Sequence, residues 1–354
     1  MKTTIDTATE TITPTRLRGA WVAGSIGFTV LVSVVALGVG PVDIAAHRVA
    51  AAVLSELPWV DLDHGLDPVQ HTIVTTVRLP RVVLGLLVGA MLSMSGAAYQ
   101  GAFRNPLADP YLLGVAAGAG LGATLAIVND WGSAVGFVDP VPLAAFIGAL
   151  IAVSVAFGVG SIGARSSVTL VLAGVAVASF FTAAQTYVLQ RNIDVVQEVY
   201  SWILGRVSTS GWGEVELLLP YAVVTVAVLL RFARALDVMA VGDEEARSLG
   251  IDPTRVRLIV VVFASLAAAA TVAVAGLIGF VGLVVAHAVR LTAGSSNRIV
   301  LPLSAIVGAA FMVLADLVAR TVISPAELPV GVVTAFIGAP FFAVVLRTTR
   351  KTLW

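Results

Sequence analysis

Residues 80–101 read PRVVLGLLVGAMLSMSGAAYQG, and Arg81 is the only charged side chain in this stretch. A helix needs about 20 mainly apolar residues to cross the hydrocarbon core of a bilayer, and this stretch is long enough. Small residues crowd it, as they do residues 113–122. Because small side chains let helices approach closely in lipid, the stretch predicts a transmembrane helix packed inside a bundle.

The composition points the same way. Of the 354 residues, 58% are hydrophobic and 12% are charged, about half the charged share of a soluble domain. The formal net charge is zero, so nothing suggests a nucleic-acid partner bound through phosphate contacts. The chain has no cysteine, which excludes disulfides, thiolate metal sites and thiol nucleophiles.

Ten apolar segments of this kind follow one another along the chain, separated by polar residues or by Pro and Gly. They lie near residues 20–40, 80–101, 110–128, 141–160, 168–190, 214–233, 256–274, 279–291, 299–321 and 331–348. We therefore predict an all-α polytopic membrane protein with a cytoplasmic tail at residues 1–19 and a transmembrane domain over residues 20–350. Segment 20–40 is about twice as long as a signal-peptide core, so an uncleaved first helix is favoured over a cleaved signal.

The orientation follows from the arginines and lysines between the segments, because cytoplasmic loops carry an excess of them. Most of the 21 basic residues fall on the side that holds the N-terminus, which predicts that both termini are cytoplasmic. The minority on the outer side are Arg48, Arg78, Arg81, Arg191, Arg206 and Arg320.

Two connections are longer than a turn. The outer one, residues 41–77, contains His47, His64 and His71; their irregular spacing favours a solvated loop over the alternative of a metal site. The inner one, residues 235–255, has a composition compatible with helix and ends at Gly250 before Pro253. This inner segment is amphipathic and lies on the side where a cytoplasmic partner could bind it.

No motif for covalent chemistry is present. The sequence has no Walker A pattern, its only lysines are Lys2 and Lys351, and it lacks both a His-Glu-x-x-His motif and a Ser/His/Asp order. We therefore expect a chain that is not an enzyme, binds no metal and has no cofactor of its own.

Four blocks carry a family resemblance. They are residues 78–114 (RLPRVVLGLLVGAMLSMSGAAYQGAFRNPLADPYLLG), 241–250 (VGDEEARSLG), 279–291 (GFVGLVVAHAVRL), and the pair 315–320 (ADLVAR) and 327–340 (ELPVGVVTAFIGAP). In this order they resemble the FecCD-type permeases, the membrane subunits of ABC importers for iron-siderophore, haem and vitamin B12. The resemblance covers nearly everything from Arg78 to Arg350. One departure is Ala286, where the family usually has proline, and its loss should straighten that helix slightly.

The resemblance implies a type II ABC importer permease fold in the cell membrane. It also implies a homodimer, or a pair with a paralogue, that binds two cytoplasmic ATPase subunits and receives its ligand from an extracytoplasmic binding protein. ATP and magnesium would be bound by the ATPase. The carried ligand is expected to be a ferric siderophore, the commonest class, with haem or cobalamin as alternatives.

The resemblance also implies four groups of site residues. Docking to glutamates of the binding protein is expected at Arg78, Arg81 and Arg320; contact with the ATPase at Gly242, Glu244, Glu245, Ala246, Leu249 and Gly250; a cytoplasmic gate at Asn105, Leu107, Ser167 and Val168; and the translocation path at Ser179, Thr182, Thr186 and Gln190.

Other interpretations of these residues stay open. The arginines could instead reach lipid headgroups, or Arg320 could pair with Asp316 one turn away. The stripe from Ser179 to Gln190, whose members recur every three or four residues, could equally form hydrogen bonds between helices. His287, in the eighth segment, is expected to have a neutral, hydrogen-bonded packing role.

Two other functional classes compete with ATP-driven import. A secondary transporter would need buried carboxylates near the bilayer midplane, yet apart from Asp316 the acidic residues lie in loops or near helix ends. A structural or sensor protein would need neither the inner helix nor the outer arginines. Import by an ABC complex is therefore the favoured function.

Overall fold

The computed structural model of the chain describes residues 17, 19–40, 44–56, 59–60, 62–131, 139–160, 167–207, 211–324 and 326–349. The predicted tail at residues 1–19 lies almost wholly outside them. The described residues form helices and short connections, with no strand among them.

The elements of the fold, in chain order, are α1 (Gly19–Gly38), α2 (Ala46–Ser55), α3 (Pro68–Thr72), η1 (Ile73–Arg78), α4 (Leu79–Phe103), η2 (Pro110–Leu113), α5 (Val115–Val128), α6 (Pro140–Gly160), α7 (Ser167–Arg191), η3 (Ile193–Val195), α8 (Val196–Ile203), α9 (Gly213–Met239), α10 (Asp243–Ser248), α11 (Pro253–Ala275), α12 (Val281–Ala293), α13 (Asn297–Thr321) and α14 (Val330–Thr349).

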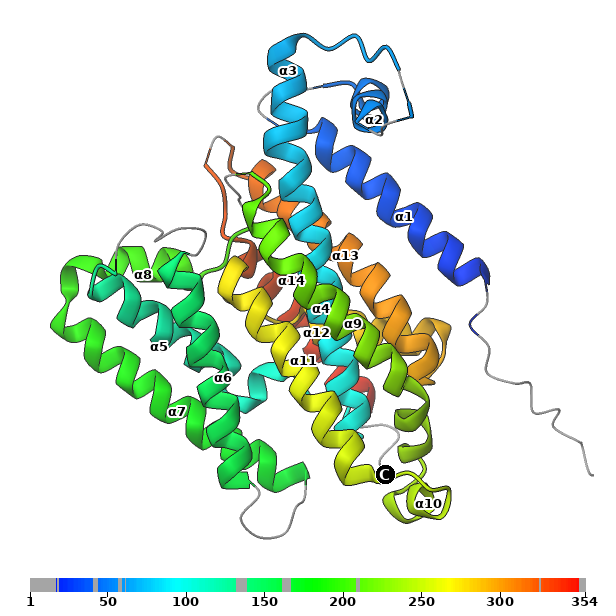
Figure 1. The fold of residues 1–354 in the computed structure, drawn as a ribbon, viewed down its shortest axis with the longest axis vertical. Coiled ribbons are helices and arrows are strands. Elements are labelled where there is room, and N and C mark those ends of the chain that lie inside the picture. Colours follow the sequence, from blue (N-terminus) through cyan, green and yellow to red (C-terminus); the bar gives the residue numbers. More distant parts are fainter. Residues whose placement is uncertain are drawn as a thin grey trace, which may run out of the picture.

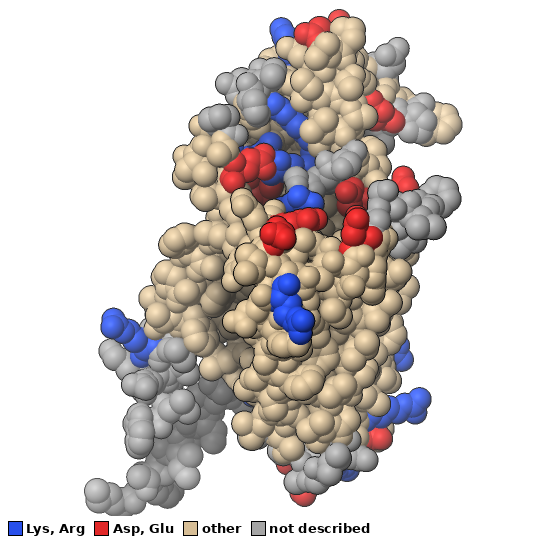
Figure 2. All heavy atoms as spheres, turned by 90° about the vertical axis from the view of Figure 1, so that its left-hand side faces the viewer, with Lys and Arg blue, Asp and Glu red and all other residues tan. Residues whose placement is uncertain are grey.

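The prediction of an all-α membrane protein is confirmed. Within the described ranges, seven helical stretches are long and apolar enough to cross a membrane, and α5, α12 and α14 add three shorter apolar helices. Each of the ten predicted segments coincides with one of them. Figure 2 shows the charged side chains gathered mainly in the upper part of one face, with a largely uncharged surface below them.

Helix α4 is the centre of the bundle (Figure 1). It packs against α9, α11, α12 and α13, and most of its residues are buried. Helices α5, α6 and α7 pack together as a second group, which joins the first through contacts of α11 with α5 and α6. Helix α1 lies at the periphery against α13, with most of its side chains exposed, as expected of a helix that faces lipid.

The central helices touch backbone to backbone. A Cβ added at Gly89 of α4 would meet the carbonyl of Gly308 of α13, and one added at Gly96 would meet the backbone of Gly282 of α12. In lipid, where no hydrophobic force draws helices together, such close approach is a main source of attraction. The small residues of the opening stretch therefore place α4 between α12 and α13.

The outer connection is more ordered than predicted. Residues 41–77 include the amphipathic helix α2, and the helix that becomes α4 begins at Pro68 rather than near residue 80. Asp67 caps this start: its side chain accepts from the backbone N–H of Gln70, and the Gln70 side chain accepts from the N–H of Asp67. This capping box, with proline at the first helical position, starts the helix before its apolar part.

We predict that Gly89→Val destabilises the bundle. The new side chain would meet backbone atoms of Gly308, which cannot move aside alone, so the free energy of unfolding should fall by about 3 kcal/mol. The thermal midpoint in detergent measures this. Gly24→Val in α1, where nothing lies within 4 Å of an added Cβ, is the matched control, and equal midpoints for the two variants would contradict the packing account.

Candidate functional site

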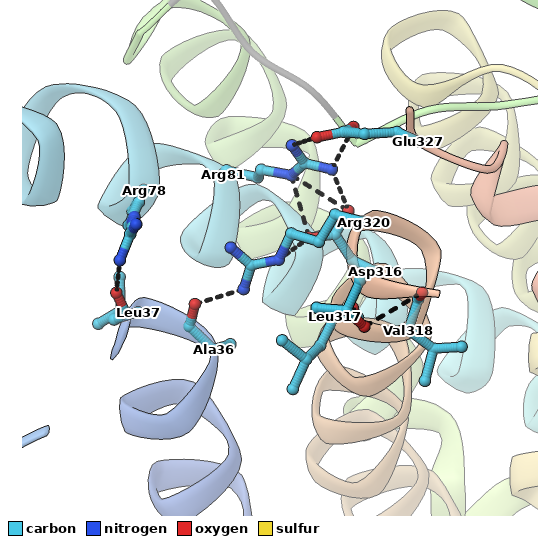
Figure 3. Close-up of polar contacts among 10 residues, drawn as sticks. Ala36, Leu37, Arg78, Arg81, Asp316, Leu317, Val318, Arg320 and Glu327 are labelled. Atoms are coloured by element: carbon cyan, nitrogen blue, oxygen red, sulfur yellow. Dashed lines mark hydrogen bonds and ion pairs between the residues drawn. The ribbon is translucent and has the colours of Figure 1, made fainter. Parts of the chain in front are cut away.

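An arginine cluster occupies the end of α4 and α13 that lies opposite α10 and that the sequence predicts to be the outer end (Figure 3). The Arg81 guanidinium donates from Nε and Nη2 to the Asp316 carboxylate, over 2.8–3.2 Å, and from Nη1 and Nη2 to the Glu327 carboxylate, both over 2.9 Å. Such bidentate, charge-assisted pairs are the stronger kind of hydrogen bond. Arg81 therefore ties α4 to α13 and to the connection between α13 and α14.

The other two predicted docking arginines contact the end of α1. Arg78 is only 6% exposed, and its Nη1 donates to the carbonyls of Leu37, over 2.8 Å, and Gly38, over 3.0 Å. Arg320 donates to the carbonyl of Ala36, and its Nε lies 3.8 Å from Asp316 Oδ2. These last carbonyls of α1 have no acceptor role inside their helix, so the two guanidiniums cap it.

The structure thus brings Arg78, Arg81 and Arg320 into one cluster, and it contains the Arg320–Asp316 pair that the sequence left open. Their docking role stays a prediction. Sequence reasoning gave no role to Glu327, although it stands in a motif block. Its position in a short outer connection, opposite outward arginines, was the available signal.

Helix α10 and the residues that flank it hold the predicted ATPase contacts at the opposite end of the bundle (Figure 1). Glu244, Glu245 and Leu249 are exposed, Leu249 by 69%. Gly250 is exposed with φ of +78°, a conformation that glycine adopts readily. Ala246, expected to form an apolar foot together with Leu249, is instead fully buried against the chain itself. The accessible apolar contact therefore rests on Leu249.

Gly242, the remaining predicted contact, is buried directly before α10, and its backbone carbonyl accepts from the N–H of Ala246. Two described arginines bind the first residue of α10. Asp243 Oδ1 lies 3.2 Å from Nη2 of Arg104 and 3.2 Å from Nη2 of Arg257. Sequence reasoning missed this carboxylate, since nothing in its own segment indicated where the arginines would lie.

The predicted gate lies partly within the described residues. Asn105 is exposed in the turn after α4, and its Oδ1 accepts from the N–H of Leu107 over 3.0 Å. Ser167 and Val168 begin α7, but their side chains lie outside the described part of the chain. Asp109, in the same turn as Asn105, caps η2 by accepting from the N–H of Tyr111, and burial raises the pKa of its carboxyl to about 6.

The predicted translocation stripe lies on an open face of α7. Ser179, Thr182 and Thr186 line one shallow groove, and Gln190 is not among its lining residues. The hydroxyls of Ser179 and Thr186 donate to carbonyls of α7 itself, one turn back. Hydrogen bonding between helices was the alternative role for this stripe. In the structure a neighbouring side chain of α7, not the hydroxyls of Ser179 and Thr186, forms such a bond.

That neighbour is Gln185, whose Nε2 donates to Thr124 Oγ1 of α5 over 3.0 Å in a buried contact. It links α7 to α5 while the stripe faces outward. His287, half-buried in α12, meets the ring of Phe341 at 6.0 Å in a T-shaped arrangement. This ring contact fits the packing part of the expected role, but the described residues give the His287 side chain no hydrogen bond.

The outer histidines form no metal site in the described residues. The rings of His64 and His71 stack with centroids 4.9 Å apart, and His71 Nε2 lies 3.3 Å from a Glu56 oxygen. Among the described residues no group of three or more His, Cys, Asp or Glu side chains is placed to hold a metal ion.

A larger cavity, which the sequence did not indicate, opens between α6, α8, α9 and α11. Its volume is about 880 Å³, and aromatic side chains and carboxylates line it together, among them Trp202, Trp212, Tyr221 and Glu214. It lies beside α8, a helix that was also not predicted.

Comparison with known proteins decides the family. The profile of the FecCD transport family matches residues 28–348. The chain belongs to the FecCD transport family. Members of this family are ABC transporter permease subunits, so the expected class of protein is confirmed.

Several relatives of this FecCD permease are similar over most of their length. It is 40% identical to the cobalamin import system permease protein BtuC of Halobacterium salinarum, over 93% of this chain and 96% of the relative. It is 39% identical to the iron(3+)-hydroxamate import system permease protein FhuB of Bacillus subtilis, over 80% of this chain and 73% of the relative. A solved structure described as an inward-facing metal-chelate type ABC transporter is 28% identical, with a TM-score of 0.81 over 94% of this chain and all of the other.

We predict that Asp316→Asn is far more destabilising than Glu327→Gln. Removing one partner of a buried ion pair costs about 3–5 kcal/mol, and the Asp316 side chain is buried beside Arg81. The Glu327 side chain is 47% exposed, so its exchange should change the free energy of unfolding by about 1 kcal/mol or less. Thermal midpoints in detergent compare the two. A larger loss for Glu327→Gln would contradict this account of the cluster.

Asp109 should make stability depend on pH. Because burial raises its pKa to about 6 in the folded chain, from about 4 when unfolded, the folded state binds the proton more tightly. The contribution of this carboxyl to the free energy of unfolding is therefore fully present below about pH 4 and is lost as the pH rises to about 6. Asp109→Asn keeps an acceptor for the N–H of Tyr111 and should remove this dependence.

Thermal midpoints of the wild type and of Asp109→Asn between pH 4 and pH 8 test this, with Asp252→Asn at the exposed cap of α11 as the matched control. The thermal midpoint of Asp109→Asn, relative to that of the wild type, should increase as the pH rises. Curves that run parallel over the whole range would contradict the assignment.

Proposed function

We propose that the chain is the permease subunit of an ABC importer that passes a metal chelate from an extracytoplasmic binding protein into the cytoplasm, using ATP hydrolysed by a separate subunit. The observation that carries this is helix α10 with the residue that follows it: Glu244, Glu245 and Leu249 are exposed there at one end of a bundle of the FecCD family. An exposed, amphipathic short helix fits a groove in a partner. ATP and magnesium belong to that partner in this proposal.

The outer arginine cluster supports docking of the binding protein. Arg81 reaches the surface beside the Glu327 carboxylate, whose side chain is 47% exposed. In this proposal an acidic group of the binding protein meets the Arg81 guanidinium at the end opposite α10, and complementary charge steers its approach.

A second permease subunit is expected to cover α7 and α14. Large apolar side chains are exposed on both helices, among them Leu172, Phe180 and Phe336, the last by 76%. The polar groove along Ser179, Thr182 and Thr186 lies on α7 as well. Pairing of these faces, in a homodimer or with a paralogue, would enclose the groove as a path between subunits.

For the cargo we propose a cobalamin or a ferric siderophore. The relatives named for cobalamin and for iron(3+)-hydroxamate import support these two classes nearly equally by identity, 40% and 39%, and the cobalamin relative aligns over more of the chain. A relative named for hemin transport in Yersinia pestis is 36% identical over 78% of the chain, so haem belongs in the same test.

The test is uptake by the reconstituted complex of this chain with its ATPase and its binding protein. Labelled cobalamin, a ferric hydroxamate and haem are supplied in turn, with and without ATP. We expect ATP-dependent uptake of one chelate and its loss in the double variant Arg78→Glu/Arg81→Glu. Because Arg78 and Arg81 also stabilise the fold, binding of the purified binding protein to Arg81→Lys, which keeps the charge, serves as the control.

Uptake that persists without the ATPase, or that follows an ion gradient, would contradict the proposed function. The protein would then belong with the secondary transporters.

A further inference from the structure

Asp243 is a junction between three helices at the end of the bundle that holds α10. Asp243 is the first residue of α10. Its Oδ1 lies 3.2 Å from Nη2 of Arg104, at the end of α4, and 3.2 Å from Nη2 of Arg257 in α11. Arg257 continues the connection, because its Nε donates to the carbonyl of Ala102 in the last turn of α4 over 3.0 Å. One carboxylate thus joins α10 to both helices.

The backbone conformation of Arg104 is a second, independent observation that indicates a role for its guanidinium. Arg104 ends α4 with φ of 51° and ψ of 37°, in the left-handed region. Helices commonly end on such a residue, and it is usually glycine, because other L-residues meet a steric cost there. A strained residue kept at such a position points to a function for its side chain, and here the side chain contacts Asp243.

Few other contacts hold α10. The helix has six residues, and in it only Ala246 is buried. Gly242, directly before the helix, is buried, whereas Val241 and Leu249 are 75% and 69% exposed. The chain itself joins α10 to α9 and α11, but a helix held so lightly by packing transmits displacement to α4 mainly through its ion pairs.

The inner end of α4 is held from the other side as well. Arg290 of α12 donates to the carbonyl of Ala97 and to Gln100 Oε1, and also to Asn297 Oδ1 at the start of α13. Helix α4 then runs through the centre of the bundle to Arg81 at its outer end. A movement of its inner end therefore reaches both the packed helices and the outer cluster.

We propose that Asp243 is a positioning residue that couples α10 to α4, so that when the ATPase displaces α10 the inner end of α4 moves with it. This inference rests on the proposed function. Exposed single ion pairs contribute little, but this carboxylate bridges two guanidiniums from two helices. The side chains of Asp243 and Arg257 are 28% and 17% exposed, and that of Arg104 is 42% exposed.

The decisive variant is Arg104→Gly. Glycine adopts the left-handed conformation without strain, so the variant should fold at least as well as the wild type while lacking the guanidinium. In the reconstituted complex we expect an unchanged or higher thermal midpoint, normal co-purification with the ATPase, and at least tenfold less chelate taken up per ATP hydrolysed. Asp243→Asn should show the same loss of coupling.

Two further variants separate coupling from general damage. Arg104→Lys keeps a positive charge and should restore most of the uptake per ATP. The double variant Arg104→Gly/Asp243→Asn should lose no more than the Asp243→Asn variant, because both remove the same contact. Arg298→Gln, which removes an exposed arginine at the start of α13, is the matched control and should couple as the wild type does.

The outcomes distinguish this inference from the proposed function. A wild-type complex without ATP-dependent uptake or stimulation of ATP hydrolysis by the binding protein would overturn the proposed function, and the inference with it. A wild-type complex that transports, beside an Arg104→Gly complex with the same uptake per ATP, would overturn the inference alone. An Arg298→Gln complex that loses as much uptake per ATP as the Arg104→Gly complex would do so as well, because the loss would not then depend on the contact with Asp243.

Discussion

The contact between the backbones of α4 and α13, at Gly89 and Gly308, is the constraint on which the rest of the structure depends. A membrane helix satisfies its own backbone polar groups, so what arranges the helices is how closely they can approach. Glycines let α4 meet α12 and α13 along its length, and this makes α4 the buried axis of the bundle. The charged groups at the two ends of this axis are positioned by that packing.

The charged groups have different roles at the two ends of α4. At the outer end Arg81 binds two carboxylates, and Arg78 and Arg320 cap α1, so the cluster holds α1, α4 and α13 together. At the inner end Asp243 receives two arginines and connects a lightly packed helix to the axis. One helix of 25 residues therefore lies between the proposed contacts with the binding protein and with the ATPase.

Length and hydropathy were sufficient to predict the ten apolar helices, because a span of the bilayer leaves a signal within one segment. The start at Pro68 was missed, since a capping box extended the helix beyond its apolar part. The arginines were identified as unusual from their outer position, and Asp316 was named as an alternative partner of Arg320. The partners of Arg81 and Arg78 were not identified, because Asp316, Glu327 and the carbonyls of α1 are distant from them in sequence. Asp243 was missed for the same reason, and the burial of Ala246 depended on packing that its segment does not reveal.

The most direct test of this account is a pair of structures of the assembled complex, one without nucleotide and one with ATP bound. The account predicts that α10 changes position between them while the Asp243 carboxylate stays within about 4 Å of Arg104, the usual limit for an ion pair, and the inner end of α4 shifts with it. An α10 that moves away from Arg104 and Arg257 while α4 keeps its place would contradict it.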